Sequence, residues 1–241
     1  MLFERRSYTL RPGNAKPFWA LQEKWNTPAQ IPGLLARNAG YFQTIAGPAE
    51  QVVHLYRFDS FDDWKTRLFG IYTADRAEYF TAGRALLAAQ ENIFLALAPI
   101  PEINPIWCES RDWLPGRPFF ADVGDTDKLV IVESTLDFVP GGLPIYWAAY
   151  QQHVLSAAPF VTSNLIGCFY TLVGLQHRVI HYRWFENHAK AQAHQEEQEE
   201  SPAWRRFADA YRPYVAHSSV SYLKPSPVAW MHALFTPVGP Y

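Results

Sequence analysis

Hydrophobic and polar positions follow the same order of patterns in both halves of the chain. Each half begins with a stretch that predicts a strand, residues 3–10 and 129–138, and each stretch ends at a Pro-Gly turn signal. Apolar residues then recur at three- and four-residue spacing in FWALQEKW and in LPIYWAAYQQHVL, which predicts an amphipathic helix. A strand and a helix therefore open each half.

A hairpin and a helical stretch follow in the same order in each half. YFQTIAG leads into QVVHLYRF, and CFYTLVG leads into HRVIHYRWF, each pair with a glycine near the turn. Helices are predicted to begin after Ser60 and Asn187, two residue types that cap helix N-termini, with Asp63 completing a capping box. They are predicted to continue through DRAEYFTAGRALLAAQ and SPAWRRFADAYRPYVAH, before the short strands IFLAL and VSYLK.

The two halves also agree residue by residue at an offset of 127. Seven positions are identical between residues 40–58 and residues 167–185, without a gap. A period this long indicates a duplicated domain, because solenoid repeats recur every 20–50 residues. Each half has the order β-α-β-β-α-β of the ferredoxin-like fold, so the fold class is α+β. The predicted domains are residues 1–98 and 128–241, the second with a C-terminal tail. They are joined by a Pro- and Trp-containing linker at 99–127.

Composition narrows the function classes. Hydrophobic residues make up 49% of the 241 residues and charged residues only 18%, which is enough apolar material for a sizeable core. The net charge of -2 gives no basic surface for nucleic acid, and no run of about 20 apolar residues is present to span a membrane. The start MLFERRSYTL lacks the apolar stretch of a signal peptide, so a cytoplasmic location is expected. The two cysteines lack the spacing of a metal site.

Several segments of the two halves resemble those of a known family. ERRSYTLRPG, GYFQT-x-x-G, VVHLYRF and AAQEN resemble the NIPSNAP family, and GCFYT-x-x-G and VIHYRWF resemble it more loosely. The resemblance covers about nine-tenths of the chain. It implies a dimeric α/β-barrel in which two ferredoxin-like sheets face one another and enclose a cavity, with helices outside. With both sheets on one chain, we expect an intrachain pseudo-dimer, which in turn is able to form a homodimer.

Strand alternation indicates which side chains share a face. Purely aliphatic positions such as Val53 and Leu55 suit a helix-covered side, so His54 and Tyr56 are predicted to face the barrel interior. The corresponding positions of the other strands add further polar groups. The predicted catalytic residues are Arg6, Tyr8, His54, Tyr56, His181 and Arg183, and the predicted substrate-binding residues are Glu4, Phe42, Phe58, Glu133 and Phe169.

These residue types favour cofactor-independent acid–base chemistry on a small hydrophobic or aromatic molecule. A histidine, His54 or His181, would transfer the proton within reach of Tyr8 or Tyr56, and an arginine would hold an anionic or enolate oxygen. Barrels of this kind include cofactor-free monooxygenases, cyclases, isomerases and lyases, which is an analogy of fold. The halves differ most at these positions, so we expect one functional cavity built mainly on the first half, with His181 and Arg183 contributing from the facing sheet.

Other interpretations of the same residues remain open. Glu4 and Arg6 would also serve as a purely structural ion pair, and both histidines as hydrogen-bonded core residues. A non-enzymatic binding or scaffold protein, as NIPSNAP proteins are often described, would instead need an exposed apolar surface. A narrower alternative is haem binding, with His54 or His181 as the axial ligand.

Overall fold

In the computed structural model the described residues form two similar halves, each with four strands and three α-helices. The structure describes residues 1–27, 33–48, 50–104, 107, 127–155 and 161–231. The first half contains β1 (Leu2–Leu10), α1 (Ala15–Trp25), β2 (Asn38–Ala46), β3 (Gln51–Phe58), α2 (Phe61–Gly70), α3 (Ala77–Leu86) and β4 (Leu87–Leu97). The second contains β5 (Val130–Phe138), α5 (Gly142–His153), β6 (Leu165–Val173), β7 (Arg178–Phe185), α6 (His188–Glu200), α7 (Pro202–Tyr211) and β8 (Val215–Pro225).

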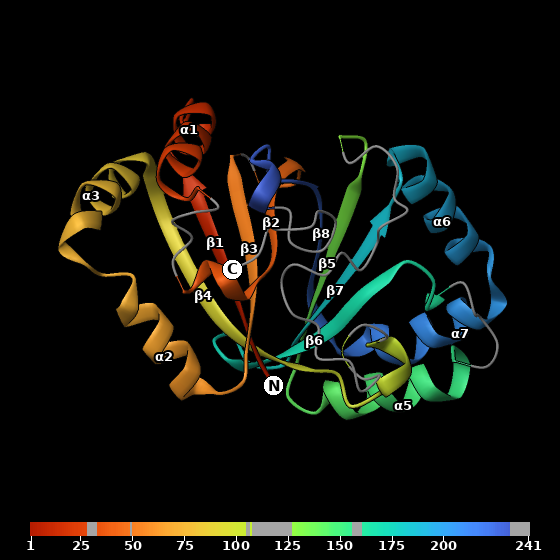
Figure 1. Ribbon diagram of the computed structural model, residues 1–241. Coiled ribbons are helices and arrows are strands. Elements are labelled where there is room, and N and C mark those ends of the chain that lie inside the picture. Colours follow the sequence, from red (N-terminus) through yellow and green to blue (C-terminus); the bar gives the residue numbers. More distant parts are fainter. Residues whose placement is uncertain (28–32, 49, 105–106, 108–126, 156–160, 232–241) are drawn as a thin grey trace.

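The eight strands form one closed barrel in the order β1-β3-β2-β8-β5-β7-β6-β4. Each half therefore supplies a four-stranded antiparallel sheet, and the two sheets join at the β2–β8 and β4–β6 edges. Helices α1, α2 and α3 cover one side of the barrel, and α5, α6 and α7 cover the opposite side (Figure 1). The expected fold, an intrachain α/β-barrel of two ferredoxin-like halves, is confirmed. None of the helices in the described ranges has the length and apolar character needed to cross a membrane.

The helical stretches begin where the caps predict but end earlier. Ser60 Oγ accepts a hydrogen bond from Asp63 N, and Asn187 Oδ1 accepts one from Lys190 N. Each predicted helical stretch is divided into two helices, α2 and α3 in the first half and α6 and α7 in the second. The division in the second half falls just before Pro202, which occupies the first turn of α7. The last strands begin at Leu87 and Val215, inside segments predicted as helix. Pairing with β1 and β5 decides this, since sheet contacts override the helix propensity of residues such as Ala88 and Ala89.

Two glycines allow the hairpin of each half to approach the other half. Gly47 and Gly174 are equivalent positions, with φ angles of 120° and 123°. A Cβ atom at Gly47 would lie 2.9 Å from Ser221 Oγ, and one at Gly174 would lie 2.7 Å from Ile93 Cγ2. Ser221 and Ile93 belong to strands of the opposite half, so these glycines are needed where the two sheets close into a barrel.

The barrel interior is filled mostly by apolar side chains from both halves. Phe3 packs against Phe169 with ring centroids 4.9 Å apart and against Trp107 at 5.0 Å. The indole of Trp107 also donates a hydrogen bond to Ile166 O, which fixes this part of the linker against the sheet. Trp113, the other linker tryptophan, lies outside the described residues. Further members of this cluster are Phe42, Val53, Leu55, Ile131, Ile180 and Leu223.

This arrangement corrects the prediction of which face points inward. Val53 and Leu55 lie in the barrel interior, whereas His54 packs against Tyr8 and Tyr41 on the outer, helix-covered face. The prediction assumed that aliphatic residues prefer the side under the helices. Two facing sheets bury their inner faces against each other, however, and so need apolar side chains there as well.

A polar group crosses the centre of this apolar interior. Arg5 Nε and Nη2 donate hydrogen bonds of 2.9 and 2.8 Å to the two carboxylate oxygens of Glu133. The Tyr182 hydroxyl donates a short hydrogen bond to Glu133 Oε2. Burial alone would raise the pKa of Glu133, but the Arg5 charge and these hydrogen bonds hold that pKa below its usual range. The pair therefore stays ionised inside the barrel and ties the two halves together.

Arg5 and Glu133 occupy equivalent positions in the two halves. Arg5 lies opposite Leu55 and Ile93, and Glu133 lies opposite the equivalent residues Tyr182 and Ser221. Matching the first strands of the two halves by their glutamates, Glu4 with Glu133, would be wrong by one residue, because the counterpart of Glu4 is Val132.

Reversing the Arg5–Glu133 pair tests this equivalence. Arg5→Glu and Glu133→Arg should each lower the free energy of unfolding by about 3–5 kcal/mol, because each leaves two like charges buried together. The double variant should recover at least half of that loss, since the positions are related by the pseudo-symmetry. Urea unfolding of the four proteins measures the coupling. A double variant as unstable as the sum of the single variants would contradict the equivalence.

Candidate functional site

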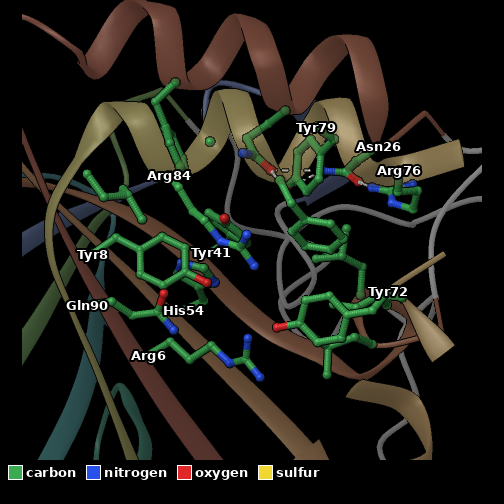
Figure 2. Close-up of a pocket in the computed structure, with 18 residues that line it drawn as sticks. Arg6, Tyr8, Asn26, Tyr41, His54, Tyr72, Arg76, Tyr79, Arg84 and Gln90 are labelled. Atoms are coloured by element: carbon green, nitrogen blue, oxygen red, sulfur yellow. Dashed lines mark hydrogen bonds between the residues drawn. The ribbon is translucent and has the colours of Figure 1, made fainter. Parts of the chain in front are cut away.

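A cavity of about 170 Å³ lies between the first sheet and its helices. Its floor is the outer face of β1, β2 and β3, and its opposite wall comes from α1 and α3 (Figure 2). The apolar part of the lining is supplied by Phe18, Leu34, Leu35, Ile71, Phe80 and Leu87. The volume lies below the 300–1,000 Å³ of typical drug-sized ligand pockets, so a small ligand fits this space.

His54 lies on the floor of the cavity between two tyrosines. Its ring stacks on Tyr41 with centroids 3.9 Å apart, and Tyr8 meets it edge-on at 4.4 Å. Nδ1 lies 3.1 Å from the Tyr56 hydroxyl, whereas the buried Nε2 has no hydrogen-bond partner among the described residues. Burial is the main reason that the pKa of His54 lies well below its ordinary value, and the nearby Arg6 and Arg5 charges lower this pKa further. The imidazole is therefore neutral near pH 7.

A buried ion pair lies beside this histidine. Arg6 Nη2 is 3.0 Å from Glu4 Oε2, and Asn92 Nδ2 donates a hydrogen bond to Glu4 Oε1. The guanidinium carbon of Arg6 lies 5.5 Å from the ring centroid of Tyr56. Burial raises the pKa of Tyr8, although the Arg6 charge works in the opposite direction. Arg6 and the neutral Tyr8 hydroxyl thus form a group of hydrogen-bond donors next to His54.

The helix side of the cavity carries a hydrogen-bonded network that the sequence did not reveal. Gln22 Oε1 accepts hydrogen bonds from Asn26 Nδ2 at 2.7 Å and from the Tyr79 hydroxyl at 3.0 Å. Arg76 donates to Asn26 Oδ1, and its guanidinium lies 4.8 Å from the Tyr79 ring centroid. These residues come from separate segments with ordinary helix patterns. The sequence signal that could have indicated this network is Gln22, a polar residue on the same helix face as the apolar Phe18 and Trp19.

The cavity lining is positively charged. It includes Arg6, Arg76 and Arg84 but no aspartate or glutamate among the described residues. Arg84 extends from α3 toward the floor of the cavity near Tyr8 and Tyr41 (Figure 2). Glu4 offsets the charge of Arg6. Among the residues that the structure describes, no carboxylate forms an ion pair with Arg76 or Arg84. The site therefore favours an anionic ligand.

A second cavity, of about 400 Å³, lies in the equivalent place on the other half. It separates the outer face of β5, β7 and β8 from α6 and α7. His181 and Arg183 line it, at the positions equivalent to His54 and Tyr56. His181 Nε2 lies 3.0 Å from the Tyr146 hydroxyl, and burial, followed by the Arg183 charge, keeps the pKa of His181 well below its ordinary value.

The residues predicted to form one site are thus distributed over three places. Arg6, Tyr8 and His54 line the first cavity, with Glu4 and Tyr56 directly in contact with them. The prediction of a single cavity completed by His181 and Arg183 was wrong, because these residues line the second cavity on the opposite side of the barrel.

The remaining predicted residues serve the core. Phe42 and Phe169 lie in the barrel interior, where Glu133 pairs with Arg5. Phe58 packs beneath α2 in a cluster with Leu2 and Tyr56. Their predicted role in substrate binding assumed that the barrel interior was the cavity, so the correction of the inward face removes its basis.

Solved structures of similar architecture exist at low sequence identity. A "putative monooxygenase" from Lactobacillus acidophilus NCFM matches with a TM-score of 0.54 and 9% identity, over 92% of each chain. A "putative monooxygenase" from Fusobacterium nucleatum matches with a TM-score of 0.57 and 8% identity, over 93% of this chain and 92% of that one. An anthrone oxidase-like protein matches with a TM-score of 0.58 and 12% identity, over 93% and 90%. These likenesses show the fold alone.

Each half also matches one family model. No protein with a curated description matches the chain. The model of the NIPSNAP family matches residues 3–101 and again residues 132–229, which together make up most of the chain. These two matches coincide with the two sheets of the barrel and with the helices that cover them. The protein belongs to the NIPSNAP family and carries two copies of its domain.

Proposed function

We propose that the first-half cavity binds a small anionic molecule with an apolar or aromatic body and removes a proton from a carbon next to its carbonyl group. The observation that carries this proposal is the neutral His54, which lines the cavity and whose buried Nε2 has no hydrogen-bond partner among the described residues. A free imidazole nitrogen beside cationic and hydroxyl donors has the composition of a general acid–base site.

The proton transfer uses one tautomer of His54. With its proton on Nδ1, His54 donates to the Tyr56 hydroxyl oxygen, and the lone pair on Nε2 is free to accept a proton from the substrate carbon. The electron pair of the broken C–H bond moves into the carbonyl group and gives an enolate. Arg6 and the Tyr8 hydroxyl then stabilise the enolate oxygen, which carries the developing charge.

Electrostatics favours this step only while substrate is bound. A proton on His54 is disfavoured in the free protein, because the ring is buried near the Arg6 and Arg5 charges. The negative charge that develops on the enolate offsets the new imidazolium charge in the same cavity. General acid–base catalysis of this kind typically contributes about 10²- to 10⁴-fold to the rate.

The names of three structural relatives suggest one continuation of this first step. Molecular oxygen reacts with an electron-rich carbanion much more readily than with the neutral carbon acid. Proton removal would therefore also open a cofactor-independent oxygenation, the class suggested by the monooxygenase and oxidase names. An isomerisation or a lyase reaction would begin in the same way, from the same enolate.

Two alternatives fit the site less well. A non-enzymatic binding protein would use the same cavity but would not need an unpartnered imidazole nitrogen in it. Haem would need far more space than the roughly 170 Å³ beside His54, whose ring is stacked on Tyr41. The other candidate axial ligand is His181, and its Nε2 is already hydrogen-bonded to the Tyr146 hydroxyl. The residues present therefore do not fit haem.

Phenylpyruvate is a suitable probe, because it is a small aromatic anion with acidic protons next to a ketone. The protein should accelerate exchange of its methylene protons in D₂O, measured by proton NMR. His54→Gln should reduce that acceleration by at least about 100-fold, since it removes the proton acceptor. An oxygen electrode run in parallel shows whether oxygen is consumed after the proton is removed.

The control variant is His217→Gln, which alters an exposed histidine outside both cavities and should leave the exchange rate unchanged. Binding of 3-phenylpropionate, which has no ketone, shows separately whether His54→Gln still takes up the anion. Exchange that survives in His54→Gln would contradict the assignment of the base. Binding without any exchange in the unaltered protein would favour the non-enzymatic alternative.

The two buried histidines should make the fold sensitive to mild acid. Both pKa values lie well below the value of about 6.5 expected in the unfolded chain, so only the unfolded state gains protons as the pH falls below 6.5. Their stabilising contribution is complete above that pH. Below it, each histidine should cost about 1.4 kcal/mol of unfolding free energy per pH unit.

Urea unfolding between pH 7 and pH 5 measures this slope. His54→Gln should remove about a third of it, because burial lowers the pKa of His194 to about 4 and makes it a third contributor to the slope. His217→Gln should leave the slope in place. An unfolding free energy that stays constant from pH 7 to pH 5 would show that the histidines do become protonated in the folded state.

A further inference from the structure

We propose that the second-half cavity is a separate ligand site, which binds an anionic molecule with an apolar body through the guanidinium of Arg183. The site is independent of the chemistry proposed for the first cavity. It would take a larger ligand, because its volume is about 400 Å³ against about 170 Å³.

Arg183 lines this cavity with a charge that no carboxylate of the described residues neutralises. Its side chain is buried, with 7% of the residue surface exposed. Nη2 donates a hydrogen bond of 3.2 Å to Val161 O, and the charge lies near the Tyr150 hydroxyl. The Nε–H group is buried without an acceptor, and no described carboxylate forms an ion pair with the guanidinium. A buried cation in this condition is costly unless an anion accompanies it.

Comparison with the first half shows why this charge has no carboxylate beside it on the sheet. In the first half Glu4 lies opposite Tyr56 across the β1–β3 pair, and Arg6 lies opposite His54. In the second half Val132 takes the place of Glu4, opposite Arg183. The arginine thus stands at the position of Tyr56, and a valine stands where the first half has the carboxylate.

Ser134 has replaced Arg6, opposite His181. Each half consequently keeps one arginine on the floor of its cavity, although the two come from different strands. The first-half arginine has a carboxylate partner within the protein, and the second-half arginine does not. A ligand carboxylate at Arg183 would restore the missing half of the pair.

The rest of the lining describes the body of the ligand. Trp204, Tyr211 and Phe185 provide aromatic walls, and hydroxyl groups of Ser134 and Ser218 lie on the floor. Among the described residues of the lining, the acidic one is Glu199. It is an exposed residue of α6 and accepts a hydrogen bond from Gln195. A bulky aryl or alkyl carboxylate therefore matches the cavity, with its charge toward Arg183 and its apolar part against the helices.

Titration calorimetry with 2-naphthoate tests the site, with the neutral 2-naphthamide as a matched ligand. The intact chain should bind 2-naphthoate at a site that depends on Arg183, and it should bind the amide there at least tenfold more weakly. Arg183→Met should weaken binding of 2-naphthoate by at least tenfold and leave the affinity for the amide similar. Arg183→Lys, which keeps the charge, should retain more of the affinity than Arg183→Met.

Two further measurements separate a ligand site from a structural role. Arg84→Met alters the first cavity only, so binding of 2-naphthoate should persist in it. Arg183→Met should unfold at the same temperature as the parent protein or at a higher one, because it removes an unneutralised buried charge. Unchanged 2-naphthoate binding in Arg183→Met, its loss in Arg84→Met, or no saturable binding to the parent protein would overturn the proposal. A large loss of thermal stability in Arg183→Met would assign Arg183 to the fold instead.

Discussion

Closure of two sheets into one barrel is the constraint on which the rest of this structure depends. Both inner faces meet at the barrel axis, so that space is filled by side chains such as Phe3, Phe42 and Phe169. The outer faces are covered by amphipathic helices that do not fill all the space beneath them. The polar residues of alternate strand positions therefore collect between sheet and helix, once on each side of the barrel, and both cavities follow from this division.

Much of the fold could be predicted from the sequence, because its signals are local and occur twice. The repeat at an offset of 127 and the caps at Ser60 and Asn187 each depend on a few neighbouring residues. The ends of α3 and α7 could not be predicted in the same way. Leu87 and Val215 begin strands only because β1 and β5 lie beside them, which no local pattern records.

Some residues of the candidate site could be predicted from the sequence, but the location of the site could not. Alternation correctly placed Arg6, Tyr8 and His54 on one face, since strand geometry fixes that relation. It does not say which face of the sheet lies inside, and an aliphatic face suits either a helix layer or a second sheet. Gln22, Asn26 and Arg76 were missed for a related reason, because a polar residue on a helix usually indicates solvent.

The Arg5–Glu133 pair bears on how this chain can evolve. In a barrel made of two identical chains, a residue near the symmetry axis faces its own copy and must be compatible with it. Arginine facing glutamate breaks that rule, because either half paired with itself would bury two like charges. Two different halves, on one chain or in a heterodimer, avoid this repulsion, and the pair ties each half to the other. Two halves expressed as separate chains should therefore assemble with each other in preference to themselves.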